Sequence, residues 1–244
     1  MHYLSYLFDS EPKRFASLLA GLGPHGVGII ASQPGRRLAE AFEGLCPLGF
    51  EGAFLDGDEI TGQAPALLNQ LEPLARQVGR VDAVRCGWNG LKGYFLAPQA
   101  LALLIERHVF PGARAIWVGR LRPELAPGLK GISRLDVAAE VPSKGEAFLA
   151  ALPMKLRGEV AVREEEVRAL AARADLVVYA GGGLPSSLLQ PYHTVLSLAK
   201  LPSDVVRLVD RVIGHEYFWG HRLALVAREL LGLALPPEIF YGEI

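Results

Sequence analysis

Apolar residues occur along this chain in two patterns that alternate with each other. Short unbroken apolar runs, such as 27–32 and 113–119, are typical of strands buried on both faces of a sheet. Between them, apolar residues recur every three or four positions, as in 64–79, which indicates helices with one buried face. This alternation predicts an α/β fold with a mostly parallel sheet and helices on its faces.

The same patterns predict where the individual elements lie. Strands are expected at 3–8, 27–32, 50–56, 113–119 and 194–199, and from 175 into the glycines at 181–183. Helices are expected at 12–23, 35–45, 64–79, 98–110, 164–174, 203–213 and 217–232. The segment 133–143 fits neither pattern better than the other, so its structure is left open.

The stretch 79–100, "GRVDAVRCGWNGLKGYFLAPQA", predicts a hairpin followed by the start of a helix. Asn89-Gly90 is a strong signal for a tight turn between two strands. The residues where the strand passes into the helix, Phe95, Leu96 and Ala97, are apolar. In α/β proteins this kind of junction usually carries polar, functional side chains, so its apolar character needs an explanation.

Composition excludes several classes of partner. The 25 basic and 26 acidic residues give a net charge of −1 without a basic stripe, so nucleic acid is not expected as a partner. No apolar run approaches the ~18 residues of a transmembrane helix, so no membrane partner is expected. The two cysteines, Cys46 and Cys86, suit a reducing compartment. They form no metal-binding pattern, and His108, His193 and His215 lack metal-ligand spacing, so no metal is expected.

The start of the chain and its amino-acid usage bear on location and source. No signal peptide precedes the first apolar run, so the expected location is the cytoplasm. Asparagine occurs only at positions 69 and 89, and methionine and cysteine are scarce. That composition is typical of a heat-adapted source, although a biased base composition would produce it as well.

Two segments carry a resemblance to a known family. Residues 47–105 have a glycine-bounded strand, a helix, a second strand, a turn and a segment that starts a helix, with Gly52, Gly79, Gly90 and Gly93 in register. Residues 213–236, "IGHEYFWGHRLALVARELLGLALP", match the end of the same pattern. On these motifs the chain resembles the shikimate dehydrogenase family, whose typical activity is the NADP-dependent reduction of 3-dehydroshikimate.

The resemblance implies two α/β domains around a cleft. Residues 1–98 with 217–244 would form the substrate-binding-like domain. Residues 99–216 would form a reduced Rossmann-like dinucleotide-binding domain.

The residues that transfer protons in this family are missing from the chain. The resemblance places Ile60 at the family's catalytic lysine and Ala97 at its catalytic aspartate. No lysine lies between Lys13 and Lys92, and no aspartate lies between Asp82 and Asp136, so a shifted alignment does not restore them. We therefore assign no catalytic residue.

The resemblance also implies substrate-binding positions. Asp56, Asp82 and His221 fall where the family has a threonine, an asparagine and a glutamine that contact substrate. Taken as residues alone, the two aspartates are better explained as surface acids at strand ends than as residues that line a cleft. His221 lies off the apolar stripe of its helix, which indicates either solvent or a cleft.

The cofactor side retains little of the family pattern. Gly119 and Arg120 follow the strand 113–119, and only one glycine of the dinucleotide fingerprint is present before Arg122-Pro123. The segment before residue 133 is too short for a full helix and a turn, and Arg134 is a weak candidate for a 2′-phosphate site. Gly181, Gly182 and Gly183 either face the nicotinamide, as the resemblance implies, or form a flexible turn. We expect no cofactor, or weak NADP binding.

Three functions follow as hypotheses. The first is a divergent paralogue that binds a small ligand in the interdomain cleft without shikimate dehydrogenase activity. The second is an NADP-dependent oxidoreductase for shikimate, quinate or another small hydroxy acid, with His221 or Asp82 as the acid–base group. The third is a non-catalytic interaction protein, and a homodimer is left open.

Overall fold

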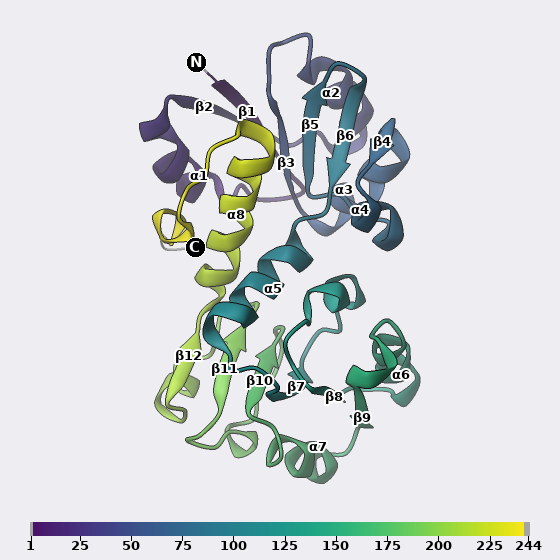
Figure 1. Cartoon of the computed structure of the whole chain (residues 1–244), viewed down its shortest axis with the longest axis vertical. Helices are drawn as coiled ribbons and strands as arrows, with labels where there is room; N and C mark the ends of the chain where they lie inside the picture. The colour runs from purple at the N-terminus through teal and green to yellow at the C-terminus, as the bar shows by residue number, and fades with distance from the viewer. Residues whose placement is uncertain (1, 242–244) are drawn as a thin grey trace. The chain divides into compact units, whose positions relative to one another are not determined.

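The computed structural model describes residues 2–241, which separate into two compact units (Figure 1). The described part of the first unit consists of residues 2–97 and 219–241, and the second unit of residues 98–218. Each unit is built around one sheet, as the alternating pattern predicts for an α/β protein.

The sheet of the first unit is mixed. Its strands follow the order β2 (Val27–Ser32), β1 (His2–Phe8), β3 (Gly52–Asp56), β5 (Ala83–Gly87), β6 (Gly90–Tyr94) and β4 (Gln70–Leu71). Strands β2, β1 and β3 are parallel, whereas β5 pairs antiparallel with both β3 and β6. The predicted hairpin is confirmed, because Ala83 pairs with Tyr94 and Gly87 with Gly90. Gly90 has a positive φ of 92°, which the tight turn requires.

The helices of the first unit are mostly short. They are α1 (Phe15–Leu22), α2 (Leu38–Leu45), α3 (Asp58–Gln63), α4 (Pro73–Val78) and the long α8 (His215–Leu231), which begins at the end of the second unit. The 3₁₀ helices are η1 (Gly23–His25), η2 (Gly35–Arg37), η3 (Ala64–Leu67) and η8 (Pro237–Phe240).

The second unit has an entirely parallel sheet. Its strands follow the order β12 (Arg211–Ile213), β11 (Thr194–Ser197), β10 (Leu176–Tyr179), β7 (Arg114–Val118), β8 (Arg134–Ala138) and β9 (Arg157–Ala161). Counted along the chain from β7, this is the 3-2-1-4-5-6 order of a Rossmann-like domain read from the other edge. The α-helices are α5 (Ala97–His108), α6 (Pro142–Ala150) and α7 (Glu164–Ala171), and the 3₁₀ helices are η4 (Pro123–Gly128), η5 (Met154–Leu156), η6 (Ser186–Leu188) and η7 (Val205–Arg207).

Two predicted helices are wrong. The helix expected at 64–79 is broken, because residues 70–71 pair with β6 and a new helix starts at Pro73. Glu72 accepts hydrogen bonds from the amides of Leu74 and Ala75, which fixes that start. The helix expected at 203–213 is instead η7 followed by β12, because parallel pairing with β11 outweighs the local helical pattern.

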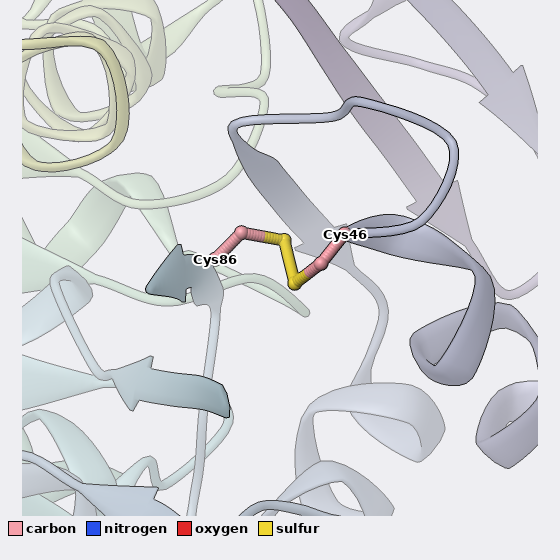
Figure 2. The surroundings of a disulfide bond; sticks show 2 residues. All are labelled: Cys46 and Cys86. Atoms are coloured by element: carbon pink, nitrogen blue, oxygen red, sulfur yellow. A yellow bond between two sulfur atoms is a disulfide. The ribbon is translucent and has the colours of Figure 1, made fainter. Parts of the chain in front are cut away.

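The structure also corrects the interpretation of the two cysteines. Cys46, at the C-terminal end of α2, and Cys86, in β5, form a disulfide although 40 residues separate them in sequence (Figure 2). They are therefore not separate thiols, and the inference of a reducing compartment loses its support. Among residues 2–241, no helix combines the length and the apolar character needed to cross a bilayer.

Candidate functional site

A cavity of about 1060 Å³ lies in the second unit at the carboxyl ends of β7, β8 and β10. The chain order reverses between β7 and β10, and parallel α/β sheets bind ligands at this kind of switch point. The predicted cofactor-binding residues all line the cavity: Gly119, Arg120, Gly181, Gly182 and Gly183. The topology therefore brings together two loops that are about sixty residues apart in sequence.

Glycine is required where these two loops meet. Gly119 has a φ of 98°, and a Cβ at this position would overlap the carbonyl oxygen of Gly181. Gly181 and Gly182 also have positive φ angles, of 96° and 88°. The hydroxyl of Tyr179 donates to the carbonyl of Gly182 at 2.6 Å and holds the turn, while burial raises the pKa of Tyr179.

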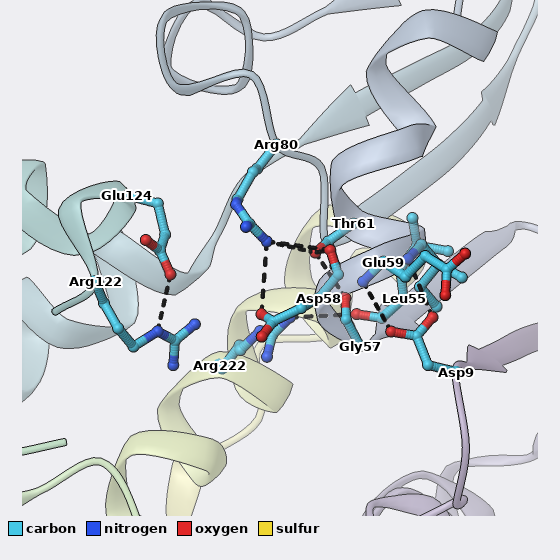
Figure 3. Close-up of polar contacts among 11 residues, drawn as sticks. Asp9, Leu55, Gly57, Asp58, Glu59, Thr61, Arg80, Arg122, Glu124 and Arg222 are labelled. Atoms are coloured by element: carbon cyan, nitrogen blue, oxygen red, sulfur yellow. Dashed lines mark hydrogen bonds and ion pairs between the residues drawn. The ribbon is translucent and has the colours of Figure 1, made fainter. Parts of the chain in front are cut away.

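The loop after β7 offers little for a pyrophosphate. As the sequence predicts, the segment contains no full helix: η4 begins at Pro123, which has no amide hydrogen. The guanidinium of Arg122 is bound to Glu124 at 2.8 Å (Figure 3). The indole of Trp117 donates to the carbonyl of Arg120 at 3.0 Å, which fixes the loop. The element after β7 is thus a short 3₁₀ helix that begins at a proline, and not an α-helix of the kind whose N-terminal amides bind phosphate in dinucleotide folds.

The suggested 2′-phosphate site at Arg134 is wrong. Arg134 begins β8, so it lies at the amino end of the strand, whereas the cavity lies at the carboxyl end. Its guanidinium is bound to Asp136 at 3.2 Å and to Glu159 at 2.8 Å.

Glu140, which the sequence reasoning missed, follows the end of β8 and does line the cavity. An acidic residue about 20 positions after the first glycine of the fold could have identified it.

Asp82 is not a surface acid. It is fully buried, and its carboxylate accepts hydrogen bonds from the amides of Leu96 at 2.7 Å and Ala97 at 2.9 Å. The guanidinium of Arg222 binds the same carboxylate at 3.0 Å. Burial raises the pKa of the Asp82 carboxyl, which Arg222 and the two amides oppose. The apolar junction at 95–97 therefore has no polar side chain of its own at the start of α5. Asp82 supplies the acceptor for the amides there.

Asp56 occupies a different setting at the end of β3. It is half-buried and accepts a hydrogen bond from the hydroxyl of Tyr6 at 2.7 Å. That hydroxyl in turn accepts from the amide of Arg14 at 3.1 Å. The guanidinium of Arg14 lies over the Trp219 ring, 3.9 Å from its centroid, and burial lowers the pKa of Arg14. Asp56 thus belongs to a network of side chains within the first unit.

His221 is 6% exposed, so the alternative that it faces solvent is wrong. The next residue on α8, Arg222, is the one that reaches Asp82, and sequence reasoning missed it. Arg222 also donates to the carbonyl of Leu55 at 3.3 Å (Figure 3). In the sequence, the position of Arg222 next to His221 in a predicted helix was the available signal for a role. Its partners, Asp82 and the carbonyl of Leu55, are known only from the structure.

The two positions that the resemblance assigns to proton transfer hold buried apolar side chains. Ile60 and Ala97 are each 2% exposed. The amide of Ile60 donates to the carboxylate of Asp9 at 3.1 Å. The amide of Glu59 donates to the same carboxylate at 2.9 Å (Figure 3). Within residues 2–241, no three histidine, cysteine, aspartate or glutamate side chains gather as a metal ion would require.

This arrangement of two sheets and a cavity at a switch point is the fold of the shikimate and quinate dehydrogenases. The chain aligns with quinate dehydrogenase from Corynebacterium glutamicum in complex with NAD at a TM-score of 0.82, with 18% identity over 98% of this chain and 97% of that one. It aligns with shikimate 5-dehydrogenase from Thermus thermophilus in complex with NADP(H) and shikimate at 0.77, with 18% identity over 99% and 97%.

A third similar structure is that of an enzyme named for a different compound. The 5-ketofructose reductase of Gluconobacter sp. strain CHM43 aligns at a TM-score of 0.81, with 15% identity over 99% of this chain and 97% of that one. No protein-family model and no curated protein matches the chain. The similarity is therefore one of fold.

Proposed function

We propose that the chain is a divergent shikimate dehydrogenase-like protein that binds a small ligand and does not catalyse the shikimate dehydrogenase reaction. The observation that carries this proposal is the pair of buried apolar side chains, Ile60 and Ala97, at the two proton-transfer positions. Oxidation of a hydroxyl by hydride transfer requires a titratable group within hydrogen-bond reach of that hydroxyl. Asp82, the nearest alternative in sequence, is committed to Arg222 and to two amides.

The ligand that suits the cavity of the second unit is the adenosine half of a dinucleotide. The walls of this cavity are mostly glycine backbone and apolar side chains, and its charged lining residues are Arg120, Glu140, Lys144 and Glu164. Of these, Glu140 lies just after the end of β8. A carboxylate at this position binds the two hydroxyls of a ribose and repels a 2′-phosphate. The loop after β7 contributes little to the pyrophosphate, so binding is weak and favours NAD over NADP.

Calorimetry with NAD and NADP tests the ligand. We expect NAD to bind more tightly than NADP by roughly tenfold, a difference of about 1.4 kcal/mol. The change Glu140→Gln should remove the repulsion of the 2′-phosphate and bring the affinities for NAD and NADP closer together. The control is Glu146→Gln, because Glu146 is an exposed residue of α6 that does not line the cavity; this change should leave the ratio of the two affinities unchanged. Low-micromolar NADP affinity in the unmodified protein would contradict the proposal.

A spectrophotometric assay of NADH and NADPH formation tests the absence of activity. We expect no turnover of shikimate or quinate above background, because loss of one acid–base group typically removes ~10²–10⁴ in rate. Robust oxidation of either compound by the pure protein would overturn this part of the proposal.

The preserved cavity favours one rival, an oxidoreductase for another small hydroxy acid or ketose. One of the similar structures is a 5-ketofructose reductase, so 5-ketofructose belongs in the substrate screen. Because the Asp82 carboxylate is bound by Arg222 and two backbone amides, His221 is the remaining acid–base candidate of the two considered. Turnover of a screened substrate that disappears in His221→Gln would establish the rival function.

We propose a cytoplasmic location, because the disulfide is compatible with the cytoplasm of a heat-adapted organism. Disulfides are rare in the cytosol of mesophiles but common in intracellular proteins of hyperthermophiles. The scarcity of asparagine, methionine and cysteine fits such a source.

A further inference from the structure

A second hollow lies in the first unit, beside the hairpin of β5 and β6. Its volume is about 670 Å³. Its lining includes Arg85, Trp88, Lys92, Tyr94 and Gln70, together with the disulfide. Neither the fold comparison nor the proposed function assigns a role to this hollow.

Two positive charges face each other across the hairpin. Arg85 and Lys92 are register partners on β5 and β6, and like charges directly opposite each other destabilise a sheet. No acidic residue lines the hollow, and within residues 2–241 neither cation forms an ion pair. The neighbouring Glu51 is bound to His2 at 2.8 Å. An anionic ligand would neutralise the two facing positive charges of Arg85 and Lys92.

Aromatic side chains complete the hollow. Trp88 is fully exposed at the tip of the hairpin, where it and Asn89 form the two-residue turn between Gly87 and Gly90. The ammonium of Lys92 lies 5.0 Å from the centroid of the Tyr94 ring. A planar apolar group placed here would cover an indole that otherwise stands in water.

The hollow is held in shape before any ligand binds. A two-residue turn fixes the register of β5 against β6. The disulfide ties Cys86 of β5 to the end of α2 (Figure 2). A site whose groups are already in position loses less conformational entropy on binding.

From these features we propose that the hollow binds a small aromatic carboxylate. The carboxylate accepts hydrogen bonds from Arg85 and Lys92, and the ring lies against Trp88 and Tyr94. This site is separate from the cavity of the second unit, so it stands whether or not that cavity binds a nucleotide.

Calorimetry with benzoate and phenylacetate tests the proposal, with benzamide and phenylacetamide as uncharged counterparts. We expect saturable binding of the acids, and binding about tenfold or more weaker for the amides, because hydrogen bonds to ionised groups are the strong ones. Red-edge tryptophan fluorescence provides a second readout, since Trp88 is fully exposed while Trp117 and Trp219 are buried.

Variants assign the binding to the hollow. Arg85→Gln with Lys92→Gln should weaken benzoate binding about tenfold or more, since both ionic hydrogen bonds are lost. The control, Arg173→Gln with Lys200→Gln, removes the same charge from exposed positions elsewhere and should leave binding unchanged. Trp88→Ala, which alters only an exposed tip, should abolish the fluorescence response and weaken binding.

Four results would overturn the proposal. They are the absence of saturable binding, equal affinity for acids and amides, unchanged affinity in the variant that lacks both cations, and binding of a short oligonucleotide far more tightly than benzoate. The last result would indicate a surface for a polyanion. The unliganded variant that lacks both cations should melt at or above the temperature of the unmodified protein, because removing the facing charges relieves repulsion.

Discussion

At the residue scale, a buried ion pair between Asp82 and Arg222 joins two distant segments of the first unit. Both side chains are buried, and the pair joins residues 140 positions apart. Breaking a buried pair by removing one partner leaves an uncompensated charge in a medium of low polarity.

The change Asp82→Asn should therefore lower the free energy of unfolding by about 3–5 kcal/mol, measured by urea denaturation. Asp204→Asn, at an exposed position, is the matched control and should change stability by less than about 0.5 kcal/mol. Adding Arg222→Met to Asp82→Asn should recover part of the loss. Equal effects of the two aspartate changes would contradict a structural role for Asp82.

His193 provides a second residue-scale test, through pH. Its ring is fully buried, with Nδ1 accepting from the amide of Gln190 and Nε2 facing the carbonyl of Ala171, both at 3.0 Å. Burial lowers the pKa of His193 below its ordinary value. Because the unfolded chain takes up this proton at a higher pH than the folded protein, stability is full above about pH 6.5 and falls as the pH drops toward the folded pKa.

Urea denaturation between pH 7.5 and pH 5 measures this effect. The loss from one group approaches about 1.4 kcal/mol per pH unit. His193→Gln should remove that part of the slope, whereas His25→Gln, at an exposed position, should not. An unchanged slope in His193→Gln would show that the ring does not titrate differently in the folded state.

At the element scale, the disulfide between α2 and β5 is the covalent link of the first unit. It closes a loop of about forty residues, which in the chain-entropy model stabilises the folded state by about 4 kcal/mol. Adding a reductant should therefore lower the melting temperature. The double change Cys46→Ser and Cys86→Ser should lower it as well and make it insensitive to reductant. Titration of two free thiols in the unreduced, denatured protein would contradict the bond.

The elements themselves were predicted unevenly. Strands such as β7, with four buried residues in five, are unambiguous because a parallel strand covered on both faces is apolar throughout. The helix expected at 64–79 is interrupted by the strand residues 70–71, and a new helix begins at Pro73. The helix expected at 203–213 does not form because residues 211–213 are an edge strand. In both cases the decisive hydrogen bonds come from a strand elsewhere in the chain.

At the scale of the whole molecule, the two units differ in how the chain forms them. The second is continuous, from 98 to 218, and has its own buried cluster, which includes Ile116, Val177 and Val195. The first is completed only when residues 219–241 return to residues 2–97. We therefore expect different behaviour from the corresponding fragments.

A fragment of residues 98–218 should fold alone and unfold cooperatively, as measured by circular dichroism. A fragment of residues 1–97 should not, because Asp82 then lacks Arg222. Fusing residues 219–244 to it through a flexible linker should restore a cooperative transition. Cooperative unfolding of 1–97 alone would contradict this account.

The sequence by itself determined the fold class, the hairpin and the loops that line the cavity. Strand runs, turn residues such as Asn89-Gly90, and glycines such as Gly119 and Gly181 act locally, so they can be recognised without knowing their partners.

Only the tertiary structure decided what the polar residues do. Asp82 gave no sign that it is fully buried, and Cys46 and Cys86 gave none that they meet. Glu140 had only its spacing from Gly119 as a signal, and the structure shows that it lines the cavity. A strand run or a turn is encoded within a few residues, whereas burial and charge pairing depend on which distant segment lies opposite. That choice is made when the sheets form, because the strand order places Arg222 against Asp82 and the loop after β8 beside the loop after β7.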